Sequence, residues 1–301
     1  MRQQHSLVKR QVVITAALIF ISLSIGHSVA AQYQNLRIQK DTSFTIRRFS
    51  KQVGDSFSLF VHLPASYNST AHKSYPIVYL LDANFYFDMM APIVSKYAEV
   101  GMLPPVILIG VGYKDFKEMD SLRDRDFTYP KSTDPKSFSI SGGGAQFLTY
   151  LQNDVMPELE HQFQADSAMR ILAGHSLGGF FTTYALMRNL ATGQMPFRYY
   201  IAASPSLDYN HYWLLGQLKQ LPPQIAGKKK VGLYITYGSL EDIEDSDMPG
   251  HITWSDISYK VGVLAKTYPL QYKTELFSSL RHMDTPIPSF IKGLQQALEN
   301  Y

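Results

Sequence analysis

The stretch MRILAGHSLG, residues 169–178, is the most informative part of the chain because it joins an apolar run to a G-x-S-x-G motif. Residues 169–173 have the length and composition of a buried strand, and a helical pattern over 178–190 follows the motif. In this context the serine occupies a sharp strand-to-helix turn, where small residues two before and two after it let the backbone cross itself closely. The stretch predicts an α/β protein with Ser176 as a nucleophile, and an ordinary turn serine or helix cap is the alternative interpretation.

On either side of this motif, short apolar or alternating runs take turns with longer helical patterns, which is typical of a mostly parallel sheet covered by helices. We expect strands at 42–48, 56–63, 75–82, 106–113, 169–173, 199–203, 231–237 and 271–277. We expect helices at 87–100, 145–164, 178–190, 209–221, 254–268 and 289–298. The first two strands are joined by a short polar turn and predict an antiparallel hairpin at one edge. This order predicts an eight-stranded α/β-hydrolase fold in one domain, residues 32–301.

The first 31 residues have the composition of a secretory signal peptide. Three basic residues precede an apolar run over 12–25, and small residues follow at 28–31. The run is about 14 residues long, shorter than the roughly 20 that a helix needs to cross a bilayer. We therefore expect residues 1–31 to be cleaved, without a stable membrane anchor, and the protein to be periplasmic or secreted. An uncleaved anchor is the alternative.

Charge and cysteine content exclude several classes of partner. Three of the 28 Lys and Arg residues, and none of the 25 Asp and Glu residues, lie in residues 1–31, so the expected mature chain is neutral. Nucleic acids and anionic membranes require a basic patch, so neither is expected as a partner. The chain has no cysteine and no histidine pair with metal-ligand spacing on a helix, and its Gly-Gly-Gly run at 142–144 lacks the lysine of a P-loop. We expect no cofactor and no metal.

A serine hydroxyl needs a neighbouring base to remove its proton. In this fold the base follows the last strand, and His282 lies between the final expected strand and helix. His211 and His251 lie near the starts of helical patterns instead, and His175 is expected to pack at the turn. The sequence therefore predicts His282 as the base.

The acid that orients the imidazole should fall between the serine and the histidine in chain order. The strand at 231–237 runs into the acidic loop GSLEDIED, residues 238–245. Glu241 is the first choice because it stands three residues after the turn glycine, and Asp242 and then Asp245 are the alternatives. An ordinary solvated loop is the other interpretation of this segment.

Further motifs extend over most of the expected mature chain: YLLDAN at 79–84, GVGY at 110–113, RDRDFT at 123–128 with Pro130, SPSL at 204–207 and GSLE at 238–241. With the serine motif, they resemble the esterase family that includes esterase D and the enterochelin (siderophore) esterases, and more distantly the mycolyltransferases. The resemblance implies an ester hydrolase with this fold.

The resemblance also implies roles for two loops. The loop after Leu-Leu-Asp would supply the second oxyanion amide, from Ala83 or Asn84, beside the amide of Leu177 at the start of the serine helix. Ala83 stands where glycine is common in the family, which leaves the donor open. The segment with Arg123 and Arg125 would lie near the site; these residues either bind an anionic acyl or phenolate group or pair with neighbouring aspartates.

Several aromatic residues fall on loops or helix starts at the same expected edge, and they are candidates for an acyl or aryl pocket or for ordinary core: Phe85, Tyr86, Phe127, Tyr129, Tyr212 and Trp213. We expect hydrolysis of a small carboxylic ester through an acyl-serine intermediate, with a siderophore trilactone or a general acyl ester as substrate. An acyltransferase with the same residues and a binding module without chemistry are the alternatives.

Overall fold

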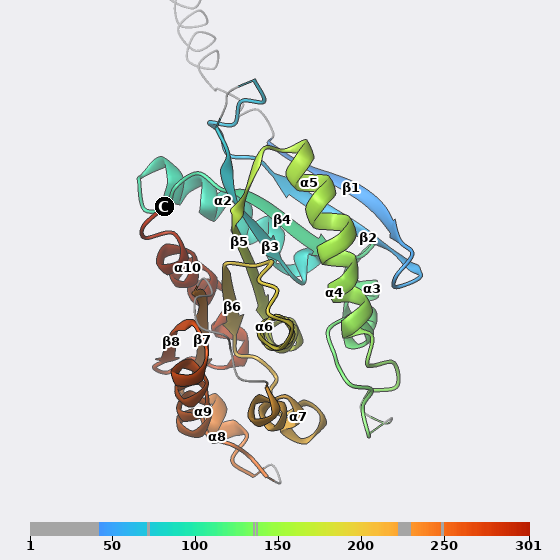
Figure 1. The fold of residues 1–301 in the computed structure, drawn as a ribbon, viewed down its shortest axis with the longest axis vertical. Helices are drawn as coiled ribbons and strands as arrows, with labels where there is room; N and C mark the ends of the chain where they lie inside the picture. Colours follow the sequence, from blue (N-terminus) through green and yellow to red (C-terminus); the bar gives the residue numbers. More distant parts are fainter. Residues whose placement is uncertain (1–41, 71–72, 135, 137, 222–229, 248–249) are drawn as a thin grey trace, which may run out of the picture. The chain divides into compact units, whose positions relative to one another are not determined.

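The structure, a computed structural model, describes residues 42–301 apart from 71–72, 135, 137, 222–229 and 248–249. The expected signal peptide therefore lies outside the described residues. Within them, eight strands form one sheet in the order β1-β2-β4-β3-β5-β6-β7-β8 (Figure 1). The strands are β1 Ser43–Ser50, β2 Asp55–His62, β3 Tyr75–Leu80, β4 Ile107–Gly112, β5 Ala165–His175, β6 Tyr199–Ala203, β7 Val231–Gly238 and β8 Leu270–Phe277.

The sheet is mostly parallel, as the sequence predicts. β1 pairs with β2, and β2 with β4, in antiparallel register, which confirms the expected hairpin at one edge. From β4 to β8 each neighbouring pair is parallel. Every residue of β3 and β4 is buried, because helices cover both faces of the parallel part.

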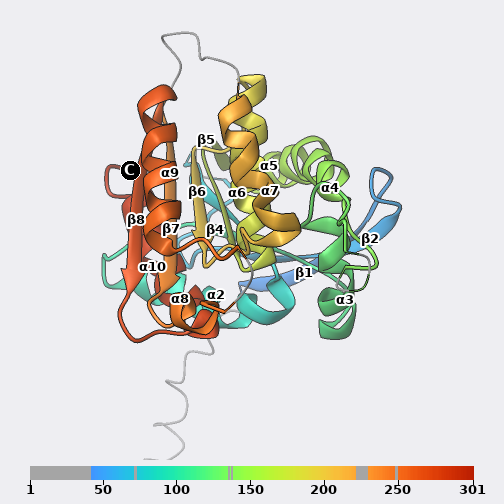
Figure 2. The same cartoon turned by 90° about the horizontal axis from the view of Figure 1, so that it is seen from below.

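Helices lie on both faces of the sheet (Figures 1 and 2). Their bounds are α2 Ala83–Glu99, α3 Phe116–Asp126, α4 Gly144–Tyr150, α5 Met156–Gln162, α6 Leu177–Thr192, α7 Tyr209–Gln217, α8 Glu241–Glu244, α9 Trp254–Thr267 and α10 Pro286–Ala297. One apolar cluster joins α2 and α10 to one face of the sheet. A larger cluster joins α4, α5, α6, α7 and α9 to the other face. None of the helices in the described residues is long and apolar enough to cross a membrane.

Several predicted helices differ from the structure in detail. The helix expected at 145–164 is interrupted by a π-helical turn, Leu151–Val155, between α4 and α5. The helix expected at 209–221 contains left-handed backbone at three consecutive residues from Asn210 and ends as α7 at Gln217, before a 3-10 turn. The final helix begins at Pro286, three residues earlier than expected, since proline is accepted in a first helical turn.

Helix α3 and the single-turn helix α8 were not predicted from the sequence. The α3 sequence, FKEMDSLRDRD, is strongly charged and buries only Met119 and Asp126, so it lacks an apolar stripe at helical spacing. Asp115 nevertheless caps this helix by accepting a hydrogen bond from the Glu118 amide at 2.9 Å.

Candidate active site

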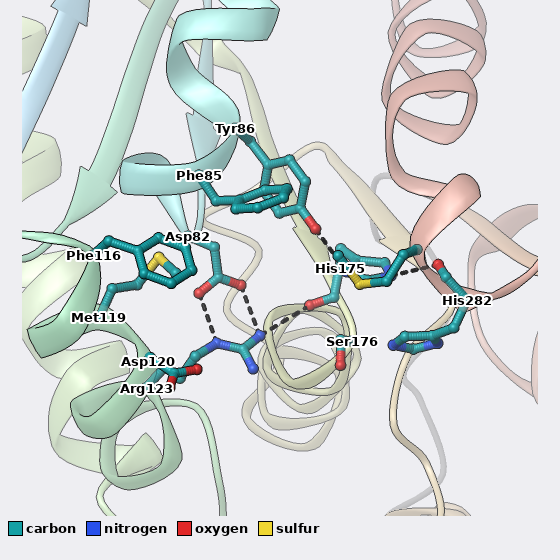
Figure 3. Close-up of a pocket in the computed structure, with 11 residues that line it drawn as sticks. Asp82, Phe85, Tyr86, Phe116, Met119, Asp120, Arg123, His175, Ser176 and His282 are labelled. Atoms are coloured by element: carbon teal, nitrogen blue, oxygen red, sulfur yellow. Dashed lines mark hydrogen bonds and ion pairs between the residues drawn. The ribbon is translucent and has the colours of Figure 1, made fainter.

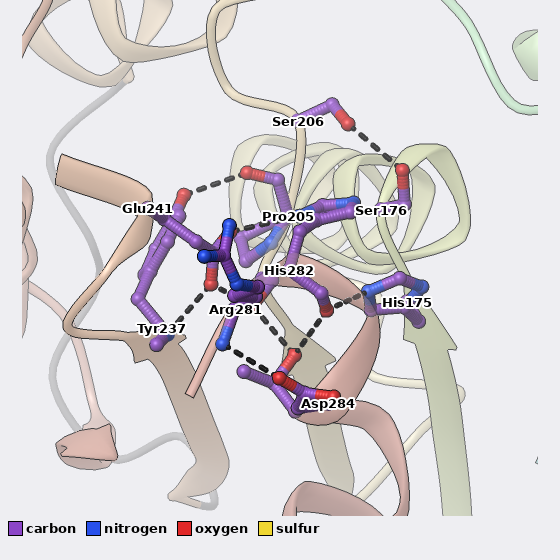
Figure 4. A network of polar contacts seen from close by, with 12 residues as sticks. His175, Ser176, Pro205, Ser206, Tyr237, Glu241, Arg281, His282 and Asp284 are labelled. Atoms are coloured by element: carbon purple, nitrogen blue, oxygen red, sulfur yellow. Dashed lines mark hydrogen bonds and ion pairs between the residues drawn. The ribbon is translucent and has the colours of Figure 1, made fainter. Parts of the chain in front are cut away.

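Four loops at the carboxyl ends of parallel strands carry the predicted site. Asp82 follows β3, Ser176 follows β5, Glu241 follows β7 and His282 follows β8. Carboxyl ends of neighbouring parallel strands meet at one edge of a sheet, where the ligands of open α/β sheets bind. The topology thus brings to one edge side chains that are up to 200 residues apart; Figure 3 shows Asp82, Ser176 and His282, and Figure 4 shows Ser176 with Glu241 and His282.

Ser176 has the strained backbone that the motif predicts, with φ 58° and ψ −121°. A Cβ atom on Gly174 would come within 2.3 Å of the Gly178 carbonyl oxygen, so the chain crosses itself too closely for a side chain there. α6 begins at Leu177, directly after the serine, and its first amides have no acceptor within the helix. The positive end of α6 therefore lies beside the Ser176 hydroxyl.

Glu241 and His282 form a hydrogen-bonded pair. His282 Nδ1 donates to Glu241 Oε2 at 2.8 Å, because a carboxylate can only accept. The other oxygen, Oε1, accepts from Ser204 Oγ and from the Gly238 amide, both at 2.6 Å. These contacts hold the buried carboxylate in place and leave Nε2 of the neutral imidazole free of hydrogen, as a general base requires.

The structure brings Glu241, the first choice for the acid, to His282 and places Asp242 elsewhere. The Asp242 carboxylate accepts from the Trp254 amide at 3.0 and 3.1 Å, at the start of α9, and lies 3.4 Å from His251 Nε2. A different buried histidine, His62, lies on β2 and hydrogen-bonds with serines away from this edge of the sheet.

Ser176 and His282 line one cavity of about 200 Å³ (Figure 3). The Ser176 hydroxyl lies 3.2 Å from Ser206 Oγ, and within the described residues no hydrogen bond joins it to His282 (Figure 4). Catalytic hydrogen bonds are often long in a free enzyme and shorten when substrate binds. Ser206 belongs to the SPSL motif, but its contact with the nucleophile was not predicted.

The expected oxyanion donors lie at the starts of two helices. Leu177 is the first residue of α6, and Ala83 is the first residue of α2. The left-handed residue in this loop is Asp82, with φ 52°, so the next position needs no glycine. The Asn84 side chain is already engaged: its Oδ1 accepts from the Tyr113 amide at 2.7 Å and its Nδ2 donates to the Tyr113 carbonyl at 3.0 Å. Only its main-chain amide remains a candidate donor.

Arg123 lines the cavity and forms an ion pair with Asp82 rather than with its neighbour Asp124. Its Nε and Nη2 donate to the two carboxylate oxygens of Asp82 at 2.8 and 2.9 Å. Burial alone would lower the pKa of Arg123, but the charge and hydrogen bonds of Asp82 raise it above its ordinary value. The cavity wall therefore carries a permanent positive charge, already balanced by a carboxylate.

The structure does not bring Arg125 to the cavity. Its guanidinium donates to both oxygens of Asp126, at 2.8 and 3.0 Å, and to Asp55 at 3.0 Å. Asp55 is the first residue of β2, so Arg125 ties α3 to the sheet. Within the described residues its contacts are those of a structural residue.

Aromatic and apolar side chains form the rim of the cavity. Phe85, Tyr86, Phe116 and Met283 line it, and three of them keep substantial exposure: Phe85 39%, Phe116 52% and Met283 57%. The centroid of the Phe85 ring lies 4.8 Å from the centroid of the Tyr86 ring and 6.0 Å from the centroid of the Phe116 ring. Phe116 was not predicted because α3 was missed.

The other aromatic candidates pack into the core. Phe127 is fully buried against Phe147, and Tyr129 packs on Tyr184. Tyr212 and Trp213 are half-buried against the same cluster.

Among the residues that the structure describes, no group of three acidic or histidine side chains is arranged as a metal site.

The chain is similar in sequence to known esterases. The sequence profile of the family described as putative esterase matches residues 50–258. The chain is similar to the ferri-bacillibactin esterase BesA of Bacillus subtilis (strain 168), with 30% identity over 214 residues, 66% of this chain and 71% of that protein.

Solved structures show the same fold. The BES protein from Bacillus cereus superposes with a TM-score of 0.70 at 24% identity, over 87% of this chain and 97% of that one. The siderophore hydrolase EstB from Aspergillus nidulans superposes with a TM-score of 0.71 at 20% identity, over 86% and 96% of the two chains.

Proposed function

The chain belongs to the putative esterase family and is a serine esterase, and we propose that it hydrolyses the ester bonds of siderophores through an acyl-serine intermediate. The observation that carries this proposal is that His282, hydrogen-bonded to Glu241 at 2.8 Å, lines the same cavity as the strained Ser176. The names of the relatives support the substrate class, since BesA is a ferri-bacillibactin esterase and EstB a siderophore hydrolase.

In the proposed first half-reaction, Ser176 Oγ attacks the ester carbonyl carbon while His282 Nε2 takes its proton. Glu241 stabilises the resulting imidazolium through Nδ1. The amide of Leu177, with that of Ala83 or Asn84, donates to the oxyanion. The tetrahedral intermediate then expels the alcohol, which takes the proton from His282, and leaves an ester on Ser176.

In the second half-reaction, water attacks the acyl-serine ester. His282 removes a proton from the water and then returns it to Ser176 Oγ, so that the free acid leaves and the enzyme is restored. The proposal needs no cofactor, because every proton transfer uses a residue at the cavity.

The cavity wall supports a substrate with an aromatic arm. Phe85 and Phe116 offer exposed rings for an aryl group, beside the ion pair of Arg123 and Asp82. Export completes the proposal: the composition of residues 1–31 favours cleavage and release into the periplasm or the medium. N-terminal sequencing of the released protein should then begin near residue 32.

The purified enzyme, Ser176→Ala and His282→Ala should be assayed on a ferric catecholate trilactone, a ferric hydroxamate ester siderophore and a p-nitrophenyl ester series. We expect both variants to lose at least about 10³-fold in kcat. A fluorophosphonate probe should label the wild type and Ser206→Ala, the matched control, but not Ser176→Ala. Wild-type turnover by Ser176→Ala would contradict the mechanism, and hydrolysis of p-nitrophenyl esters alone would contradict the siderophore substrate.

A further inference from the structure

The main-chain carbonyl of His282 accepts hydrogen bonds from two buried side chains. His175 Nε2 lies 3.0 Å from this oxygen (Figure 4), and Thr285 Oγ1 lies 2.9 Å from it. Behind His175, the Tyr86 hydroxyl lies 2.8 Å from Nδ1 (Figure 3). Tyr86, His175 and Thr285 are each at most 3% exposed. Two of these side chains, Tyr86 and His175, also line the cavity.

The proton positions in the series of hydrogen bonds from Tyr86 through His175 follow from the final acceptor, the His282 carbonyl oxygen. A carbonyl oxygen can only accept, so His175 carries its hydrogen on Nε2 and a lone pair on Nδ1. Tyr86 must therefore donate to Nδ1. Burial and then the nearby charge of His282 lower the pKa of His175 to about 3, which keeps its ring neutral. Burial, with the charge of Asp82, raises the pKa of Tyr86, which keeps its hydroxyl protonated.

The second donor, Thr285, does not give its hydroxyl hydrogen to the His282 carbonyl alone. Ser204 gives its hydroxyl hydrogen to Glu241 Oε1, so the 2.7 Å contact between Ser204 Oγ and Thr285 Oγ1 requires the hydrogen of Thr285. The same hydrogen is the one that reaches the His282 carbonyl. One hydrogen is thus shared between two acceptors, whereas the His175 N–H has the His282 carbonyl as its acceptor.

The imidazole of His282 has little packing of its own to hold it. The side chain is 37% exposed and belongs to a three-residue 3-10 turn, His282–Asp284, in which no residue is buried. Its ring contacts the His175 ring at a centroid distance of 4.5 Å. The ring position therefore depends on Glu241 and on the anchored main chain, and a displacement of about 1 Å at such a group can reduce the rate about 100-fold.

We propose that Tyr86 and His175 are positioning residues that act through the His282 main chain. Tyr86 fixes the tautomer of His175, and His175 fixes the carbonyl of His282, which sets the imidazole relative to Ser176. This inference rests on the proposed function, in which His282 is the base. It also couples the cavity wall to the base, because Tyr86 lies on α2 beside Phe85.

The test distinguishes the effect of the His175 tautomer on kcat from the effect of the size of its side chain. In His175→Gln the amide nitrogen can take the place of Nε2 as a donor, and an amide needs no partner to keep its hydrogens. We expect His175→Ala to lower kcat about 100-fold and Tyr86→Phe about 10-fold, with KM changed less than about 2-fold. His175→Gln should remain within about 3-fold of the wild type, and adding Tyr86→Phe to it should have no further effect.

The double variant His175→Gln/Tyr86→Phe is the critical test of the proposal. If Tyr86→Phe reduces kcat equally in the wild-type and His175→Gln backgrounds, the hydroxyl acts on the substrate and the proposal is overturned. It is also overturned if His175→Ala and Tyr86→Phe both turn over at the wild-type rate while His282→Ala is inactive. Full activity of His282→Ala would instead overturn the proposed function. Thermal unfolding of each variant identifies any that fails to fold. If His175→Ala does not fold, the effect of Tyr86→Phe on kcat in the wild-type and His175→Gln backgrounds still tests the proposal.

Discussion

Two buried carboxylates lie near Ser176, and each accepts hydrogen bonds from a basic side chain. Asp82, after β3, gives both oxygens to the guanidinium of Arg123. Glu241, after β7, gives one oxygen to the imidazole of His282 and the other to Ser204 and Gly238. Arginine keeps its proton in proteins, whereas histidine exchanges it near neutral pH. Equivalent positions at strand ends thus hold a fixed ion pair near Ser176 and, in the proposed mechanism, a second pair that transfers a proton.

Glu241→Gln should show the largest effect, because it removes the charge on the proton-transferring side. The amide can donate to Nδ1 and favour the wrong tautomer of His282, so we expect kcat to fall about 10³- to 10⁴-fold. Steady-state hydrolysis of a good ester substrate measures this. A loss in kcat below about 10-fold would contradict the assignment of proton transfer to the Glu241–His282 pair.

Asp82→Asn should act on stability instead. It leaves the Arg123 charge, whose side chain is 17% exposed, without a carboxylate, and breaking such a pair costs about 3–5 kcal/mol. Urea unfolding would measure the loss, with Glu241→Gln beside it. Asp82→Asn/Arg123→Met should recover much of the free energy, because no unpaired charge remains. If Asp82→Asn unfolds like the wild type, the fixed pair is not structural.

His175 lies between the two pairs, with its carbonyl 3.5 Å from Arg123 Nη2 and its ring against His282. Its pKa is lowered by burial to about 3 in the folded protein, from about 6.5 when unfolded. Between these values the unfolded chain binds a proton that the folded chain does not, so stability falls as pH falls from 6.5 toward 3. Relative to His175→Gln, the wild type should lose up to about 1.4 kcal/mol per pH unit in this window, measured by urea unfolding. Parallel curves would show that His175 titrates normally.

Asp242→Asn should have the smallest effect. Its carboxylate serves the Trp254 amide, and asparagine retains a carbonyl oxygen for that bond. We expect kcat/KM within about 2-fold of the wild type and a nearly unchanged melting temperature. A loss close to that of Glu241→Gln would mean that Asp242 shares the role of the acid.

The sequence predicted the parts of the molecule that follow from local pattern and chain order. All eight strands were expected, because apolar runs of strand length alternate with helical patterns. Ser176, Glu241 and His282 were each placed by their position after a strand, and the structure puts all three at one edge of the sheet.

Contacts between distant segments were not predictable in this way. Arg123 pairs with Asp82, 41 residues earlier, and not with its neighbour Asp124. The contact of Ser206 with Ser176 and the positions of Phe116 and Met283 at the cavity depend on how α3 and two loops pack. A charged helix such as α3 has no apolar periodicity to reveal it. The link from Tyr86 to His282 likewise joins segments nearly 200 residues apart.

Helix α3 suggests how substrate range can be engineered in this protein. Its last turns are held by Arg123, which pairs with Asp82 after β3, and by Arg125, which pairs with Asp55 of β2. Its first residue, Phe116, is exposed at the cavity rim. Phe116 and Asp120, both on α3, line the cavity, so a library randomised at these two positions would alter the cavity wall and leave Ser176, His282 and Glu241 untouched. Directed evolution toward new esters should therefore begin on this helix rather than at the strand ends.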